Sequence, residues 1–247
     1  MNGIINGAAG KMGKLLIKEF SRVYPNGKIA RVDPAFKGSE EGTDSMEKVT
    51  GKYDVIIDFS HHTSAPSLAE YAAKTHTPLV ICTTGHTEEE KEAIARAAKS
   101  VPVFFAGNTS VGIAVLSDAV RRATAAMSGA EIEIVEIHHK EKKDAPSGTA
   151  LMLAEAAREA RPELFIKAGR SGEGAREKNE IGISSVRYGE VVGVHEVIVS
   201  TPTETLTFRH EAHDRSVFAV GAMQAAEYIV KKAAGTYSMK DVLADGE

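Results

Sequence analysis

Short apolar runs alternate with amphipathic helical patterns through roughly the first hundred residues. Most of these runs are apolar without strict alternation, which is typical of strands that are buried on both faces. Strands separated by helices in this way form a parallel sheet covered by helices on both sides. The predicted strands are 4–5, 28–32, 55–59, 79–82 and 103–106, and the predicted helices follow Gly10 and cover 65–74 and 87–99.

The pattern changes near Ser110. A long helix (111–127) leads to a strand (131–138), a polar loop (140–147), a helix (150–160) and a loop rich in glycine and charge (161–179). Three extended segments, 182–188, 190–201 and 204–210, are separated by turns, which favours antiparallel pairing. An amphipathic helix (217–232) follows. We predict an α/β fold: a Rossmann-like, doubly wound parallel sheet over 1–108, completed by the C-terminal helix region 217–247, and an α+β domain with a mixed or antiparallel sheet over 109–216.

The composition narrows the possible partners. The 247 residues carry a net charge of −4, which lacks the basic surplus of a nucleic-acid-binding surface. A single cysteine excludes a disulfide framework, and no apolar run reaches the length of about 18 residues that would span a bilayer. We therefore expect a cytoplasmic protein that binds neither nucleic acid nor membrane.

The segment Gly7-Ala8-Ala9-Gly10-Lys11-Met12-Gly13 lies between the first predicted strand and the first predicted helix. This context is the one that a dinucleotide-binding turn requires. Gly7 permits the tight turn, Gly10 lets the backbone approach a pyrophosphate, and Gly13 lets helix and strand pack closely. Free N–H groups at the start of the helix would then face the phosphates.

Asp33 ends the second predicted strand, twenty residues after Gly13. A carboxylate at this place hydrogen-bonds the ribose hydroxyls of a bound dinucleotide. Pro34 follows it where an arginine would favour a 2′-phosphate, although Lys37 could partly compensate. The cofactor is expected to be NADH or NADPH, with NADH favoured.

A second informative segment covers residues 136–150 and contains two histidines, three lysines and the start of a helix. His138 can carry a proton near neutral pH, and Lys142 is a second donor. Ser147-Gly148-Thr149 presents N–H groups and hydroxyls at a helix N-terminus, where a carboxylate binds favourably. We predict a small anionic substrate that must be protonated.

These residues also resemble a known family, that of 4-hydroxy-tetrahydrodipicolinate reductase (dihydrodipicolinate reductase), which acts in the diaminopimelate route to lysine. The resemblance is strongest over His138-His139-x-x-Lys142-x-Asp144-Ala145-Pro146-Ser147-Gly148-Thr149-Ala150. It extends to the glycine turn, Asp58-Phe59-Ser60, Thr83-Thr84-Gly85, Asn108-Thr109-Ser110-Val111-Gly112 and Val186-Arg187-x-Gly189-Glu190-Val191-Val192-Gly193-x-His195.

The resemblance implies NAD(P)H-dependent reduction of a cyclic dicarboxylate with loss of water, by a homotetramer assembled through the sheet of the substrate domain. By similarity, His138 and Lys142 form the proton-donating pair, and the substrate carboxylates are held by His139, Gly148 and Thr149. The residues expected to line the cofactor are Gly7, Ala8, Ala9, Gly10, Lys11, Met12, Asp33, Cys82, Thr83, Thr84, Ala106, Gly107, Asn108 and Thr109. The sequence departs from the family at Cys82, where glycine is common, and at Thr109, where Phe or Met is usual.

Two other classes of function stay open on the residues alone. One is a dinucleotide-binding sensor without turnover, and the other is a lyase or hydrolase that uses His138 as a base. The His–Lys pair argues against the sensor, and Asp33 after the glycine turn argues against the non-redox enzyme. No metal site is expected, because His61, His62, His76 and His86 lack the spacing of zinc ligands.

Overall fold

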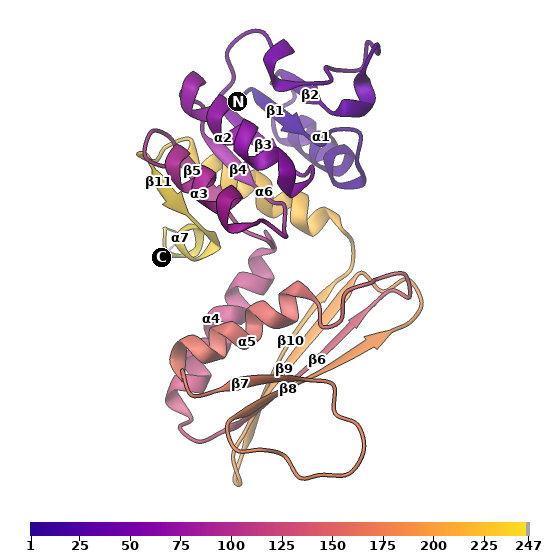
Figure 1. Ribbon diagram of the computed structural model, residues 1–247, viewed down its shortest axis with the longest axis vertical. Helices are drawn as coiled ribbons and strands as arrows, with labels where there is room; N and C mark the ends of the chain where they lie inside the picture. Colours follow the sequence, from indigo (N-terminus) through magenta and orange to yellow (C-terminus); the bar gives the residue numbers. More distant parts are fainter. Residues whose placement is uncertain (246–247) are drawn as a thin grey trace. The chain divides into compact units, whose positions relative to one another are not determined.

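The computed structural model describes residues 1–245 and divides the chain into two compact units (Figure 1). The first unit comprises Met1–Val111 together with Arg215–Glu247, and the second comprises Gly112–Asp214. Within the described residues, no helix combines the length and the apolar character needed to cross a membrane. The two units are described separately.

A six-stranded parallel sheet forms the centre of the first unit, in the order β11-β5-β4-β3-β1-β2. Its strands are β1 (Gly3–Asn6), β2 (Ile29–Val32), β3 (Val55–Asp58), β4 (Leu79–Ile81), β5 (Pro102–Phe105) and β11 (Gly235–Tyr237). The sheet places the carboxyl ends of β1, β3 and β4 side by side. The sequence prediction of a Rossmann-like parallel sheet is confirmed.

Helices cover both faces of this sheet: α1 (Lys11–Val23), α2 (Ala65–Thr75), α3 (Glu88–Ala97) and α6 (Ser216–Ile229). Ile4, Ile56 and Leu79 belong to one apolar cluster with residues of α2 and α3. Their neighbours Ile5, Ile57 and Val80 are fully buried and point to the opposite face, because side chains alternate along a strand. The helices α1 and α6 contact each other, and α6 also contacts β3, β4 and β5.

Short elements complete the first unit. They are the single-turn 3₁₀ helices at Pro34–Phe36, Met46–Lys48 and His62–Ser64, and α7 (Met239–Ala244). The strand β11 lies beside β5 although more than a hundred residues separate them in the sequence (Figure 1). Neither β11 nor α7 was predicted from the sequence, because three residues are too few to show a strand pattern. The last long helix ends at Ile229, slightly earlier than expected.

The second unit contains a five-stranded mixed sheet in the order β10-β9-β6-β8-β7. Its strands are β6 (Glu131–His138), β7 (Phe165–Ala168), β8 (Glu180–Arg187), β9 (Gly193–Ser200) and β10 (Thr205–Ala212). The helices α4 (Val111–Ala126) and α5 (Gly148–Ala160) lie on one side of it (Figure 1). Residues of both helices join Ile132, Ile134 and Ile181 in one apolar core.

The expected antiparallel pairing of the three extended segments is correct for β9 with β10 and wrong for β8 with β9. Instead, β6 lies between β8 and β9, parallel to β8 and antiparallel to β9. The segment after Tyr188 therefore crosses over the end of β6 rather than forming a hairpin. A local turn signal could not reveal this, because pairing with a strand fifty residues away is decided by the buried face of the whole sheet.

The prediction of an irregular loop over 161–179 is wrong for Phe165–Ala168, which forms the edge strand β7. The rest of the loop is held by ion pairs. Glu180, which is buried, faces Arg170, Lys167 and Arg176. The glycines and charges predicted a mobile loop, but three of the basic residues pair with one buried carboxylate.

Candidate active site

The glycine turn joins β1 to α1 with very little space for side chains. Gly7 has a φ of +79°, which favours glycine, and a Cβ there would lie 2.6 Å from the carbonyl oxygen of Phe59. A Cβ on Gly13 would lie 2.1 Å from the carbonyl oxygen of Gly7. The helix therefore packs directly on the turn, as the sequence predicts for Gly13.

Gly10 is the N-cap of α1 and is exposed, and a Cβ there would meet only the Gly7 carbonyl, at 3.2 Å. Among residues 1–245 no side chain caps this helix start, and its first turn carries no acidic residue. The N–H groups at the start of α1 thus face outward without an anion of the protein's own. This cradle fits a pyrophosphate. Of the other turn residues, Ala8 is buried, Ala9 and Met12 are half-buried, and Lys11 is exposed.

Asp33 connects the second strand to the glycine turn. Its Oδ2 accepts a hydrogen bond from the N–H of Ala9 at 3.0 Å, and its Oδ1 accepts one from the N–H of Ala35 at 3.0 Å. Each oxygen retains a further lone pair for another donor. Asp33 therefore both supports the turn and offers an acceptor beside it.

A pocket of about 570 Å³ opens beside this turn, a size common for small-molecule sites. Gly7, Gly10 and Asp33 line it, together with Asp44 and Glu47. No lysine or arginine of the described chain is among its lining residues, and the one residue there that can become cationic is His61. Of the acidic residues in the lining, Asp44 is paired with Lys48 Nζ at 2.6 Å, which leaves Asp33 and Glu47 as the other negative groups. His62, the other histidine of the pair, binds Glu90 through Nδ1 at 2.8 Å.

The ends of three strands are tied together by Asp58, whose side chain is fully buried. Its carboxylate accepts hydrogen bonds from Asn6 Nδ2 (2.9 Å), Ser60 Oγ (2.6 Å) and Thr83 Oγ1 (3.3 Å). Burial raises the pKa of this carboxyl, and these donors oppose the rise. Asp58 thereby fixes the loops after β1, β3 and β4 against one another.

The loops after β4 and β5 contain the remaining residues expected at the cofactor. Thr84 and Gly107 lie close together, since a Cβ on Gly107 would be 3.1 Å from Thr84 Cγ2. Cys82 donates its N–H to Asp58 O at 3.0 Å, and burial raises the pKa of its thiol well above the ordinary value, with Asp58 adding to the rise. A thiol with a raised pKa has a small thiolate fraction at neutral pH and is therefore a poor nucleophile.

Thr109 is placed differently from the other residues of this set. It is buried, and its Oγ1 donates to the carbonyl oxygen of Phe218 in α6 at 2.7 Å. A Cβ on Gly221 of the same helix would lie only 1.7 Å from Thr109 O. The side chain of Thr109 thus packs on α6, while the neighbouring Asn108 uses Oδ1 to accept the N–H of Ser110. Cys82, Thr83, Thr84, Ala106, Gly107, Asn108 and Thr109 do not line the pocket beside the glycine turn.

In the second unit, His138 ends β6 with its ring buried against Glu136, which precedes it on the same face of the strand. Nδ1 of His138 lies 2.5 Å from Glu136 Oε2. Burial lowers the pKa of His138, Glu136 raises it, and Lys142 and Arg187 lower it. The other ring nitrogen, Nε2, faces Gly193, where a Cβ would lie 3.1 Å away.

Glu136 is fully buried, and its two oxygens receive four donors. Arg187 donates from Nη1 to Oε2 (2.9 Å) and from Nη2 to Oε1 (2.7 Å), and the N–H of Ser147 donates to Oε1 (3.1 Å). Burial opposes ionisation, but Arg187 and the other donors prevail and lower the pKa of Glu136 to about 2. The group is a carboxylate at neutral pH.

Lys142 lies on the loop after β6, and its Nζ pairs with Asp144 Oδ1 at 2.8 Å. The carbonyl oxygen of Asp144 accepts a hydrogen bond from Arg187 Nη2 at 2.7 Å. Ser147 is the N-cap of α5, and its Oγ accepts the N–H of Ala150. His139 is half-buried, and Gly148 and Thr149 form the first turn of α5.

His195 on β9 completes this cluster. Its ring packs edge-on against His138, with 5.1 Å between the ring centroids, and its Nε2 lies 3.1 Å from Ser147 Oγ. Burial and the nearby His138 lower the pKa of His195 to about 3, so the ring is neutral. Since Ser147 Oγ accepts from Ala150, its hydroxyl proton can be donated to His195 Nε2.

Glu136, His138 and His195 bring three potential metal ligands within 4.8 Å of one another. Arg187 donates to both oxygens of Glu136. A metal ion would have to displace this guanidinium or share the carboxylate with it, which the repulsion between two cations opposes. The cluster is therefore better suited to holding a proton than a metal.

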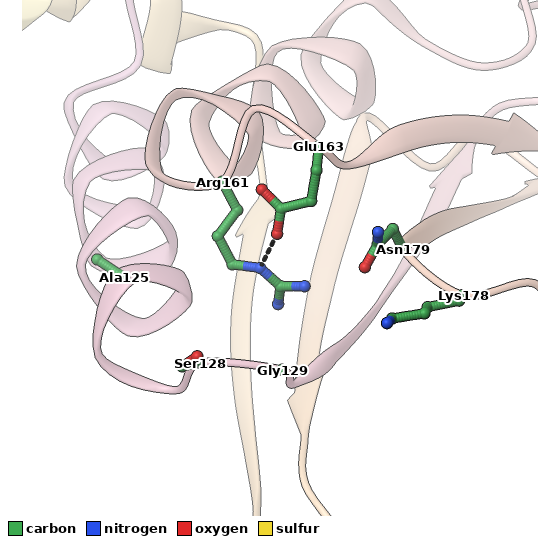
Figure 2. A pocket seen from close by; sticks show the side chains of 7 residues that line it. All are labelled: Ala125, Ser128, Gly129, Arg161, Glu163, Lys178 and Asn179. Carbon is green, nitrogen blue, oxygen red and sulfur yellow. Dashed lines mark hydrogen bonds and ion pairs between the residues drawn. The ribbon is translucent and has the colours of Figure 1, made fainter.

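A further pocket lies elsewhere in the second unit and contains none of the predicted site residues (Figure 2). It is lined by Ala125, Ser128, Gly129, Arg161, Glu163, Lys178 and Asn179. Arg161 in its wall binds Glu163 at 2.9 Å and the carbonyl oxygen of Ala130 at 2.8 Å. The guanidinium is thus engaged in holding the chain after α5.

Comparison with known proteins decides the family. Family models described as "Dihydrodipicolinate reductase, N-terminus" and "Dihydrodipicolinate reductase, C-terminus" match residues 1–109 and 112–243. This chain belongs to the dihydrodipicolinate reductase family. The sequence prediction of the family is confirmed, and so is the prediction of a reductase that uses NAD(P)H.

Relatives match over nearly the whole chain. A 4-hydroxy-tetrahydrodipicolinate reductase of Caldanaerobacter subterraneus subsp. tengcongensis is 40% identical and covers 98% of each chain. One of Clostridium perfringens is 39% identical and covers 97% of each. The structure of a dipicolinate-bound dihydrodipicolinate reductase from Paenisporosarcina sp. TG-14 superposes with a TM-score of 0.79 at 24% identity, over 96% of this chain and 97% of that chain, which shows the shared fold.

The structure gives contacts to residues for which the sequence analysis assigned no role of their own. Glu136, Arg187 and His195 lie around His138, and Asp58 and Asn6 support the glycine turn. Glu136 could have been found, because it precedes His138 by two residues and so shares its face of the strand. Arg187 could not, because its place depends on the unexpected pairing of β8 with β6.

Proposed function

We propose that this chain reduces 4-hydroxy-tetrahydrodipicolinate to tetrahydrodipicolinate, with loss of water and at the expense of NAD(P)H, in the diaminopimelate route of lysine biosynthesis. The observation that carries the proposal is the buried cluster in which Glu136 receives His138 Nδ1 and Arg187, beside a loop that carries Lys142. A protein that only senses a dinucleotide has no use for such a cluster. Family membership supplies the identity of the substrate.

His138 and Lys142 are assigned as the proton donors. Because Nδ1 of His138 faces the Glu136 carboxylate, the exchangeable proton is at Nε2. Burial lowers the pKa of His138, so the imidazolium releases this proton readily. His139, Gly148 and Thr149 are assigned to the substrate carboxylates, where the first turn of α5 supplies N–H groups and a favourable dipole.

Residues 1–108 and 217–247 are assigned to dinucleotide binding. A reduced nicotinamide supplies the hydride when it is bound. The uncapped start of α1 would hold the pyrophosphate, Asp33 would accept from ribose hydroxyls, and the loops with Cys82, Thr83, Thr84 and residues 106–109 would lie along the cofactor. The set also includes Ala8, Ala9, Lys11 and Met12 of the turn. For Thr109, the contribution is its backbone, since its hydroxyl is bonded to Phe218.

NADH is the preferred cofactor under this proposal. A 2′-phosphate beside Asp33 would meet a pocket lined by Glu47 and by Asp44, which pairs with Lys48 at 2.6 Å; among the described residues, no lysine or arginine is part of the lining itself. Repulsion between like charges would then weaken the binding of NADPH. Pro34 occupies the position at which an arginine could otherwise bind the 2′-phosphate.

Residues 109–216 are assigned to substrate binding and to assembly into a homotetramer in the cytoplasm. The sheet of the second unit has helices on one side only, and its other side carries the partly exposed side chains Val135, Ile137, Val186 and Ile198. An apolar strip of this kind on a sheet face is suited to burial against a second copy. Sedimentation of the purified chain at several concentrations tests the assembly.

The activity is tested by following nicotinamide absorbance while the synthase that precedes this step supplies the substrate. Oxidation of NADH or NADPH that depends on both the synthase and this chain is expected. Binding of a dinucleotide without oxidation, at any substrate supply, would instead support a sensor and remove the proposal.

A further inference from the structure

One guanidinium joins the two residues assigned as proton donors. Nη1 and Nη2 of Arg187 hold both oxygens of Glu136, and Nη2 also holds the carbonyl oxygen of Asp144. Glu136 in turn contacts His138, and Asp144 contacts Lys142. Both His138 and Lys142 thus reach Arg187 through one intervening acidic residue.

The contact with Glu136 determines which ring nitrogen of neutral His138 carries the proton. A carboxylate only accepts hydrogen bonds, so the nitrogen 2.5 Å from it, Nδ1, must carry a proton. Neutral His138 is therefore the tautomer with Nδ1 protonated and Nε2 free. Loss of the carboxylate would release the ring to adopt either tautomer.

The carboxylate itself cannot move freely, since it is completely buried and has four donors. Two of the donors come from Arg187 in the parallel, two-pronged geometry that fixes a carboxylate plane. The third, the N–H of Ser147, ties Glu136 to the N-cap of α5. The orientation of His138 is thus coupled to the start of the helix assigned to substrate carboxylates.

We propose that Glu136 and Arg187 are positioning residues that set the tautomer of His138 and the place of Lys142. The proposal rests on the proposed function for the roles of His138 and Lys142. Neither positioning residue delivers a proton to the substrate. Glu136 acts through His138, and Arg187 acts through Glu136 and through the Asp144 segment.

Glu136 and Arg187 have opposite effects on the pKa of His138. The charged and titratable groups that face its ring are Glu136 on the same strand, Arg187 on β8, His195 on β9 and Lys142 on the following loop. The negative charge of Glu136 favours the imidazolium, and the positive charge of Arg187 opposes it. Removing Glu136 should therefore lower the pKa of His138, and removing Arg187 should raise it. If the two substitutions only loosened the site, the pKa of His138 would shift in the same direction in both variants.

The test is ¹⁵N NMR of the histidine rings across a pH titration, on the whole chain without cofactor or substrate. In the wild type, we expect the neutral His138 ring to carry its proton on Nδ1. Glu136→Gln should mix the two tautomers and lower the pKa of His138, and Arg187→Met should raise it. Arg122→Met, which removes an exposed guanidinium from α4, is the matched control and should change neither.

Turnover supplies the second measurement. Glu136→Gln and Arg187→Met should lower kcat by about 10- to 100-fold, part of the usual contribution of a general acid, while Arg122→Met keeps the wild-type rate. Arg187→Lys keeps the charge without the two-pronged geometry, and it replaces Arg187→Met if that variant does not fold. For Arg187→Lys we expect kcat to fall about tenfold, with no large shift in the pKa of His138.

Two results would overturn the inference. One is a neutral wild-type His138 protonated on Nε2, which is measurable even if no variant folds. The other is a shift of its pKa in the same direction in Glu136→Gln and Arg187→Met. Because these spectra require no turnover, the inference can fail while wild-type oxidation of nicotinamide still supports the proposed function, and the reverse.

Discussion

Arg187 lies directly beside His138 in the parallel pairing of β8 and β6, yet its guanidinium binds Glu136, the residue two positions earlier on the same face. A cation beside a histidine disfavours protonation of the ring. Glu136 is placed so that it contacts both, and its negative charge compensates the guanidinium. The site therefore keeps a histidine next to an arginine without excluding the imidazolium form.

The first prediction concerns the assigned proton donors. His138→Ala or Lys142→Ala should lower kcat by about 10²- to 10⁴-fold, which is the usual contribution of general acid catalysis. The Kd for NADH, measured by fluorescence titration, should barely change, because both residues belong to the other unit. Lys140→Ala removes an exposed lysine of the same loop and is the control. Wild-type turnover in both active-site variants would contradict the assignment.

The second prediction concerns the cofactor. In Asp33→Asn, the ratio of kcat/KM for NADH to that for NADPH should fall about tenfold, equivalent to about 1.4 kcal/mol, because the carboxylate proposed to bind ribose hydroxyls and to repel a 2′-phosphate is lost. Asp54→Asn, at a carboxylate that instead accepts the N–H of Asn2, should leave the ratio unchanged. A strong preference of the wild-type protein for NADPH would contradict the proposed role of Asp33.

A third prediction separates two glycines of the same turn. Gly13→Ala should lower the free energy of unfolding by about 3 kcal/mol or more, because its Cβ would meet the Gly7 carbonyl at 2.1 Å and backbone cannot move aside cheaply. Gly10→Ala meets the same carbonyl at 3.2 Å and should cost much less. Urea unfolding measures both. Equal losses of stability would show that α1 does not pack on the turn as closely as described.

The fourth prediction is a dependence of stability on pH. Burial first, and then His138, lowers the pKa of His195 from 6.5 to about 3 in the folded chain. A lowered pKa contributes stability that is complete above pH 6.5 and is lost as the pH falls toward 3. The difference in unfolding free energy between the wild type and His195→Gln should therefore narrow over this range. His213→Gln, at an exposed position of the same unit, is the matched control.

The arrangement of the first unit follows closely from its sequence. Continuously apolar runs separated by helices admit few alternatives to a covered parallel sheet. The predicted helix start at residue 87 agrees with α3, because Thr87 is its N-cap and forms a capping box with Glu90. The strand β11 was not predictable, since its three residues gain their conformation from pairing with β5 rather than from any pattern of their own.

The site in the second unit was only partly predictable. His138 and Lys142 stand out as chemical groups within one segment. Their supporting residues come from β8 and β9. The sequence analysis predicted that these two strands pair as a hairpin, and in that arrangement Arg187 would not lie beside His138. The strand order of a sheet depends on the packing of the complete core. The contact between Arg187 and Glu136 could therefore not be predicted without the strand order.

The discontinuous first unit has a consequence for biosynthesis. Its sheet is flanked by α6 and closed by β11, and both are translated only after residues 112–214. Until then, the faces of α1, β4 and β5 that α6 covers in the finished protein have no partner from this chain. All of the second unit therefore leaves the ribosome before the first unit has received α6 and β11. At that stage, the first unit still exposes the apolar surface that α6 later covers. During this interval, the exposed apolar surface of the first unit is open to aggregation, which chaperones suppress.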